Sequence, residues 1–355
     1  MRMKNRVETD RSSNIELLRI LCMLIIIMGH LCQGVIGGGK YDIDQTSLKI
    51  LQFGSANGQM AANCFFLITG FFMNRKKKIN LSTVRRLVGT VIFYSYSIGL
   101  IFFLLDPHFV KSTCSSKDYL KIFFPVSCNQ WWFISAYIGL YLIMPYVNKM
   151  IDSISQAEFS RLIVILIVMM SVLPTLLLSG TWMSNFSWAI TLYLAGAYIN
   201  RYPMKIDKIR TGWLAVITVS GIVLLGSSVV LLNMYPSILR KVGSDLHFRG
   251  MNQIPCFITS LSLFIWSTRW KIQCSTVNLC AKYTFGVYLI HMNILLQQVI
   301  WKYLASFKIL FSEPKFTFCT ILIIPIFMYS VCAIIDFARN KIFEKVGRLL
   351  WRRVA

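Results

Sequence analysis

Apolar stretches of about 18 to 22 residues recur along the whole chain, separated by short segments that carry most of the charge. A helix needs about 20 such residues to cross the hydrocarbon layer of a bilayer, and its backbone groups must bond internally there. The pattern predicts an all-α, polytopic transmembrane bundle of about ten helices, at 14–36, 57–73, 87–105, 131–148, 162–179, 186–200, 213–234, 253–268, 283–301 and 316–338.

These stretches fill the chain, so we predict a single membrane-embedded domain over residues 1–355, with a basic tail at 339–355. No soluble domain, long linker or repeat is visible, and the longest polar stretch, 106–130, is predicted to be a loop. The first apolar stretch follows several basic residues, as in a secretory signal sequence. It lacks a small-x-small cleavage site, which favours an uncleaved first helix.

The charge pattern predicts the orientation. Only 14% of the residues are charged, against about a quarter in soluble domains, and the net charge is +23. With the N-terminus inside, the predicted inner segments hold 25 of the 37 lysines and arginines, and the outer loops hold 11. This excess follows the positive-inside rule. We therefore expect both termini in the cytoplasm, a location in the cell membrane, and anionic lipids rather than nucleic acid as partners of the basic loops.

The ten cysteines lie mostly inside apolar stretches and show no metal-ligand spacing. We expect most of them to behave as small apolar residues, with no bound metal. Cys114 and Cys128 share one predicted outer loop, which leaves a disulfide between them open.

Two titratable residues lie in the first predicted helix. Arg19 and His30 are 11 residues apart, about 16 Å of helical rise and close to three full turns, so both face the same way. Such side chains are costly in a membrane and are functional candidates. The structural alternative is that Arg19 reaches the inner headgroups, paired with Glu16, and that His30 hydrogen-bonds to another helix.

Arg19 and His30, with ten residues between them, match the R-x10-H motif of the bacterial membrane acyltransferases, the acyltransferase three family. The chain resembles that family at four further elements, in family order: N-I-E-L-L-R-I at 14–20, F-F-L-I-T-G-F at 65–71, W-F at 132–133 followed by Tyr141 and Pro145, and Y-T-F-G-V-Y-L-I-H at 283–291. It departs from the family at Glu16 (often Asp), Thr69 (Ser) and Gly89 (often Pro).

The resemblance implies an O-acyltransferase that moves an acyl group, most often acetyl, from cytoplasmic acetyl-coenzyme A to a hydroxyl of a cell-surface polysaccharide or its lipid-linked precursor. Acetyl-coenzyme A would be a substrate, with no permanently bound cofactor, and polysaccharide assembly proteins would be possible partners. His30 would be catalytic, as a general base or as a nucleophile. Supporting roles fall to two groups: Arg19, Arg85 and Arg86 on the donor phosphates, and Glu16, Thr69, Trp132 and His291 around the substrates.

Each supporting residue has a structural alternative. Thr69 with Gly70 fits a helix-packing contact, Trp132 an aromatic belt, and the Arg85-Arg86 pair a topology determinant. A different function also stays open: a transporter or flippase of a lipid-linked glycan, in which Arg19 and His30 line a polar path without chemistry. A silent assembly subunit is a third reading. No H-E-x-x-H, G-x-S-x-G or P-loop motif is present, which argues against a metalloprotease, an α/β-hydrolase or an ATPase.

Overall fold

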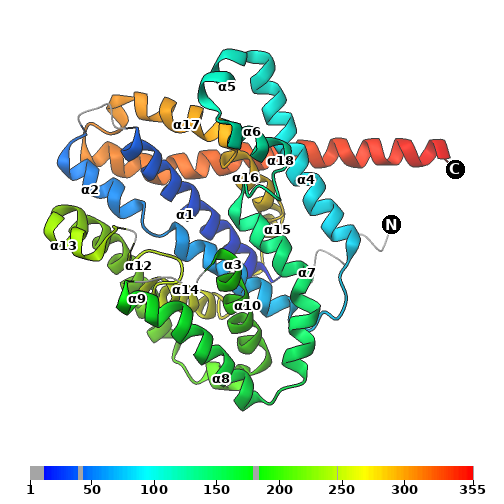
Figure 1. Cartoon of the computed structure of the whole chain (residues 1–355), viewed down its shortest axis with the longest axis vertical. Coiled ribbons are helices and arrows are strands. Elements are labelled where there is room, and N and C mark those ends of the chain that lie inside the picture. Colours follow the sequence, from blue (N-terminus) through cyan, green and yellow to red (C-terminus); the bar gives the residue numbers. More distant parts are fainter. Residues whose placement is uncertain (1–11, 39–42, 179–183, 246, 355) are drawn as a thin grey trace.

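A computed structural model describes residues 12–38, 43–178, 184–245 and 247–354, and these residues form helices and turns without a strand. Figure 1 shows the arrangement, with α1 near the middle of the molecule. The longer helices are α1 (Ser13–Gly37), α3 (Gly58–Met73), α4 (Leu81–Leu105), α7 (Trp132–Asp152), α8 (Gln156–Ile167), α10 (Asn185–Arg201), α12 (Thr211–Met234), α14 (Ile254–Ser267), α17 (Ile294–Ser306) and α18 (Pro314–Val354).

Shorter helices connect them. Among the described residues these are α2 (Gln45–Gly54), α5 (Pro107–Thr113), α6 (Ser116–Phe123), α9 (Leu173–Leu177), α11 (Pro203–Asp207), α13 (Pro236–Val242), α15 (Ser275–Ala281), α16 (Thr284–His291), the π-helix η1 (Val168–Val172) and the 3-10 helix η2 (Lys308–Leu310). The predicted loop at 106–130 is wrong in part, because it contains α5 and α6. Their caps were readable in the sequence: Asp106 before Pro107, and Ser115 with Asp118 as a capping box.

The polytopic helical bundle is confirmed, and each predicted span has a helical counterpart. Within the described part of the chain, five helical segments are long and apolar enough to cross a membrane, or six when a broken pair counts as one span. The predicted helix 283–301 is that pair: it breaks between His291 and Ile294, and the two parts are bent by 84°. Asn293 causes a new start, since its side chain caps the first amides of α17. Helices α3, α10 and α14 have only 16, 17 and 14 residues.

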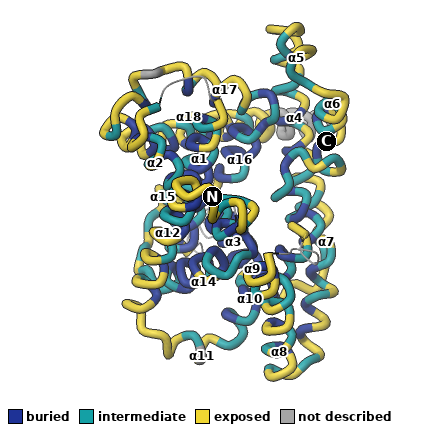
Figure 2. Tube along the Cα trace, turned by 60° about the vertical axis from the view of Figure 1, so that its left-hand side comes forward, coloured by how far each residue is buried: buried dark blue, intermediate teal, exposed yellow. Residues whose placement is uncertain are grey.

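The packing is tightest between α3 and α10. A Cβ atom at Gly70 would lie 2.0 Å from the carbonyl oxygen of Tyr193, and one at Gly196 would lie 2.2 Å from that of Leu67. Small residues let helix backbones approach in this way inside a membrane. Figure 2 shows buried residues along α1, α3 and α16, and exposed ones on outlying helices such as α5. Large exposed apolar side chains lie on α4 and α18, where lipid would cover them: Leu100, Ile101, Phe103, Leu104, Ile323, Ile326 and Phe327.

Polar contacts gather several chain segments at the end of the bundle where α1 begins. The Asn14 side chain donates to the carbonyls of Ser267 and Thr268, at the end of α14. Arg269 donates to the carbonyl of Ile206 and to the Thr211 hydroxyl. All these segments belong to the inner side in the charge-based topology, so the fold agrees with the predicted alternation of helix directions. The sidedness itself stays a prediction.

The tail and the cysteines complete the comparison. The last span continues without a break into the basic tail, so that α18 runs to Val354 and projects from the bundle (Figure 1). All ten cysteines, Cys114 and Cys128 included, are free thiols. The disulfide that the sequence left open is not formed in the structure.

Candidate functional site

A cavity of about 320 Å³ lies between α1, α3, α7 and the α15–α16 segment. Arg19 and His30 both line it, as their spacing along α1 predicts. Between these two residues the walls are mainly apolar, with side chains from three helices: Met23, Ile26, Ala62, Phe65, Ile68 and Phe133. The cavity is therefore a passage with a guanidinium toward one end, an imidazole toward the other, and apolar walls between them.

His30 is hydrogen-bonded to His291, which α16 places behind it. The His30 Nδ1 atom lies 3.3 Å from His291 Nε2, and His291 Nδ1 lies 2.7 Å from the carbonyl oxygen of Val287. His30 lines the cavity, whereas His291 is 0% exposed. This one contact thus joins the R-x10-H motif to the element 283–291, although the two histidines are 261 residues apart in the sequence.

These distances fix the tautomers of the two rings. A carbonyl oxygen only accepts, so Nδ1 of His291 must donate, and a neutral imidazole has a single N–H. The Nε2 atom of His291 is then an acceptor, and Nδ1 of His30 donates to it. Nε2 of His30 is left with a free lone pair. A histidine held this way can take a proton from a group in the cavity.

Arg19 lies near the beginning of α1. Its Nη1 atom is 3.1 Å from Glu16 Oε1 and 3.3 Å from Oε2, which confirms the predicted pair. The Glu16 side chain is 9% exposed and that of Arg19 35%. Both contacts use the same amino group, so the other guanidinium N–H groups stay available to an anion.

Lys282 lines the same cavity, from the turn between α15 and α16. Lys282 is one of the 25 basic residues that the charge count assigns to the inner side, and its place in the cavity was not predicted. The available signal was its place directly before the element 283–291. With Arg19, it brings a second positive charge to the cavity wall.

Thr69 and Trp132 also line the cavity, and Gly70 does not. The Thr69 hydroxyl donates to the Phe65 carbonyl at 2.7 Å, and the Thr69 side chain also interacts with the Tyr137 hydroxyl across the cavity wall. Gly70 serves the contact with α10 described above. The packing reading is confirmed for Gly70, and a substrate role of Thr69 stays a prediction.

Arg85 and Arg86 lie exposed near the start of α4 and do not line the cavity, although the next residue, Leu87, does. The structure therefore brings together Arg19, His30, Thr69 and Trp132, places Glu16 and His291 in contact with two of them, and leaves the Arg85-Arg86 pair outside.

Amide side chains near His30 were not predicted. Gln33 follows His30 by three residues on α1 and donates to the Ser55 carbonyl at 3.3 Å. Gln59 lines the cavity too, and its buried Oε1 atom has no hydrogen-bond partner among the described residues. Gln33 could have been found from its helical spacing; Gln59 depends on tertiary packing. An amide side chain has both donor and acceptor atoms, so it can form hydrogen bonds with hydroxyl groups.

The N-terminus of α3 meets α1 beside His30. A Cβ atom at Gly29 would lie 3.7 Å from the Cα of Gly58, the first residue of α3. Gly58 and Gln59 line the cavity, and the Asn57 side chain does not cap the helix. Since the first amides of a helix have no intrahelical acceptor, this end offers N–H donors and a partial positive charge near the imidazole.

His108 and His247 lie in predicted outer loops, so the sequence predicts that both are solvated. His108 is exposed, as expected of a solvated side chain. His247, also expected to be solvated, is buried and lies 3.1 Å from the Thr175 carbonyl. That expectation is wrong for His247, because the loop folds back onto α9. Among the described residues, no group of three or more His, Cys, Asp or Glu side chains is placed to hold a metal ion.

Comparison with known protein families matches residues 12–336 to the model of an acyltransferase domain. The match covers nearly the whole chain and includes Arg19, His30, Thr69 and His291. Curated proteins and solved structures give no match.

Proposed function

Because the chain belongs to the acyltransferase 3 family, we propose that this multi-pass membrane acyltransferase moves an acetyl group from cytoplasmic acetyl-coenzyme A to a hydroxyl of a cell-surface polysaccharide or of its lipid-linked precursor. The observation that carries this proposal is the hydrogen bond from cavity-lining His30 to buried His291. It leaves His30 with a free lone pair beside the space where two substrates would meet.

The donor would enter from the end of the cavity near Arg19. Coenzyme A carries its phosphates at one end and its thioester on a long thin arm. Arg19 and Lys282 supply two positive charges for phosphate oxygens, the first in a bidentate geometry. The apolar passage then suits the arm, because Arg19 and His30 are separated by about 16 Å of helix.

The acceptor would bind at the His30 end. Gln33, Ser55 and Gln59 supply polar groups there, and the free Gln59 Oε1 can accept a bond from a sugar hydroxyl. The N-terminus of α3 would stabilise the negative charge that grows on the acyl oxygen as the hydroxyl attacks.

The chemical step is an acyl transfer. Nε2 of His30 takes the proton of the acceptor hydroxyl while its oxygen bonds to the thioester carbon. The tetrahedral intermediate then collapses, the carbon–sulfur bond breaks, and the proton passes from His30 to the departing thiolate. The products are an O-acetyl ester and free coenzyme A. His291 holds the ring and its tautomer and itself neither gains nor loses a proton overall.

The chief rival is a transporter of a lipid-linked glycan, in which the same cavity would bind the glycan diphosphate and let it cross. Family membership favours transfer chemistry, and so does the histidine pair, since transport needs no ring with a defined lone pair.

Membranes that contain the protein, incubated with radiolabelled acetyl-coenzyme A, distinguish the two functions. We expect label in a glycan with the wild-type protein and almost none with His30→Ala. A binding assay on the purified variant should show that coenzyme A affinity is retained. Exposed His108→Ala is the matched control and should transfer normally. Glycan that crosses the membrane without acquiring label would support the transporter instead, and normal transfer by His30→Ala would refute the assigned role.

A further inference from the structure

A second, larger cavity of about 700 Å³ lies away from the His30 site and shares no lining residue with it. It is a groove between the segment that joins α3 to α4 and the last two turns of α7. Three lysines line it: Lys77 and Lys78 from the connecting segment and Lys149 from α7. The proposed acyl transfer makes no use of it.

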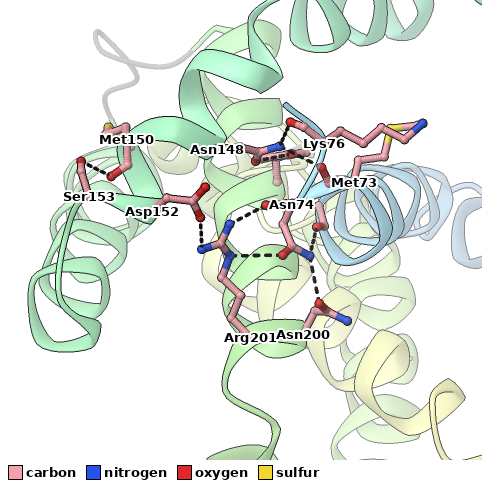
Figure 3. A network of polar contacts seen from close by, with 11 residues as sticks. Met73, Asn74, Lys76, Asn148, Met150, Asp152, Ser153, Asn200 and Arg201 are labelled. Atoms are coloured by element: carbon pink, nitrogen blue, oxygen red, sulfur yellow. Dashed lines mark hydrogen bonds and ion pairs between the residues drawn. The ribbon is translucent and has the colours of Figure 1, made fainter. Parts of the chain in front are cut away.

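The groove is held by a polar network, shown in Figure 3. The Asn148 amide donates to the carbonyls of Met73 and Lys76, at 2.8 and 2.9 Å, and accepts from the buried Tyr193 hydroxyl at 2.7 Å. These bonds fix the connecting segment directly against the turn of α7 that bears Lys149. The position of the lysines is therefore set by specific contacts and not by the general basicity of a loop.

Among the described residues, Asp152 is the only carboxylate that lines the groove, and it is already paired with a positive charge. Asp152 lies 2.7 Å from the Nη1 atom of Arg201, whose Nε donates to Asn74 (Figure 3). By contrast, Lys77, Lys78 and Lys149 are exposed and form no ion pair with any described residue. Three uncompensated positive charges thus share one concave surface, which is an arrangement that attracts an anion.

The neighbouring face of α7 points to a lipid as the source of that anion. Leu142, Tyr146 and Met150 are spaced four residues apart, so they form one stripe along the helix, and they are 39%, 71% and 40% exposed. Tyr146 also lines the groove. Along α7, apolar Leu142 comes first, then Tyr146, and then Lys149 with the lysines of the groove. This order matches that of acyl chain, interface and headgroup in a bilayer.

We propose that this groove binds the phosphate of an anionic phospholipid headgroup, with the acyl chains along the exposed stripe of α7. The segment 74–80 belongs to the inner side in the charge-based topology, where anionic lipids attract basic side chains. Such a lipid would brace α7, which also carries Trp132 and Phe133 into the His30 cavity.

Native mass spectrometry of the purified protein with phosphatidylglycerol or phosphatidylcholine tests this proposal. We expect the wild-type protein to retain phosphatidylglycerol in preference to phosphatidylcholine. The Lys77→Gln/Lys78→Gln/Lys149→Gln variant should retain less phosphatidylglycerol, by a factor of about ten or more, because each basic residue near an anionic surface contributes to binding. The control is Lys111→Gln/Lys117→Gln/Lys302→Gln, which removes three exposed lysines without an ion pair elsewhere and should bind as the wild type does. Thermal unfolding shows whether each variant is folded; if the triple variant is not, Lys78→Gln/Lys149→Gln replaces it and should show an intermediate loss.

A second arm separates the lipid from a soluble phosphate. Binding of pyrophosphate alone is measured by calorimetry on the same variants. Equal retention of phosphatidylglycerol by the wild type and the groove variant would overturn the proposal. So would pyrophosphate binding that depends on the three lysines while lipid retention does not, because the site would then belong to a soluble anion.

Discussion

At the scale of single residues, the proposed function depends on a contact that no local pattern contains. The His30–His291 bond sets which nitrogen of His30 is free, and Val287 sets it in turn by accepting from His291. A change at His291 should therefore alter the chemistry of His30 without removing it.

We predict that His291→Ala lowers kcat by about a hundredfold, because the imidazole of His30, the proposed general base, loses its orientation, with little effect on coenzyme A binding. His291→Gln should recover part of the loss, since its amide oxygen can accept from Nδ1 of His30. Initial rates and donor affinity of purified variants measure the two effects. A loss of donor binding equal to the loss of rate would show that His291 acts in folding or binding instead.

Substitutions of Arg19 and Lys282 should weaken donor binding more than they slow the chemical step. Arg19→Ala is expected to weaken coenzyme A binding by about ten- to a hundredfold, the usual contribution of a charge-assisted hydrogen bond, and Arg19→Lys to restore only part of it. Lys282→Gln should weaken it less, because the lysine is exposed and strongly hydrated. Glu16→Ala should be mild, because its partner is partly solvated.

Direct titration of the variants with coenzyme A gives these affinities. Coenzyme A without its 3′-phosphate tests whether phosphate is the recognised group. Arg86→Ala is a suitable comparison, since Arg86 is exposed and lies outside the cavity. If it weakens binding more than Arg19→Ala does, the phosphates bind outside the passage.

The sequence alone could pair Arg19 with His30, because helical rotation is a local property and 11 residues close three turns. It could also pair Arg19 with Glu16, one turn apart. It could not find the place of Gln59, which reaches the cavity through contacts between helices that are distant in sequence, and for Lys282 it offered only the position directly before the element 283–291. The resemblance supplied His291, and only the structure supplied its hydrogen bond.

At the scale of helices, the two end regions of α3 differ in how much space they leave beside a glycine. Gly70 lies against the Tyr193 backbone, and Gly58, at the other end of the same helix, has open space where a Cβ would be. The two positions make a matched pair.

Gly70→Ala should destabilise the protein by about 1–3 kcal/mol or more, because the added methyl would overlap a backbone atom that cannot move alone. Gly58→Ala should leave stability unchanged. Thermal unfolding in one detergent measures both variants, each relative to the wild type. Equal stabilities would mean that α3 and α10 can separate without cost.

Helix existence was predictable for every span, since hydropathy reports it directly. Helix length was predicted closely for α3 and α10 but not for every helix: α4 begins at Leu81, six residues before the predicted start, and α18 continues past the predicted end at 338 to Val354. The bend at Met292 and Asn293 was also missed. Its cause is a polar cap inside an apolar run, and an averaged hydropathy does not register one residue.

At the scale of the whole molecule, the charge count and the fold agree on which helix ends lie on the same side of the bundle. Asn14, Asn74, Arg201 and Arg269 each tie together segments that the count assigns to one side. The His30 end of the cavity lies with the opposite set, near Ser55 and Arg249, whose Nη1 donates to the Ser55 carbonyl at 3.1 Å. If the helix ends near Asn14 are cytoplasmic, the helix ends near Ser55 must face outward.

Reporter fusions test this arrangement. Fusions after Lys78 and Tyr202 should report the cytoplasm, and fusions near Ser116 and Ser244 the outside, because 25 basic residues then lie inside against 11 outside. The proposed function depends on the result: the donor is cytoplasmic, so Arg19 must lie toward the inner face, and the acceptor must reach His30 from the outer face. A cytoplasmic signal at Ser116 would place the loop between α4 and α7 inside, reverse those helices, and remove the outward access that His30 needs.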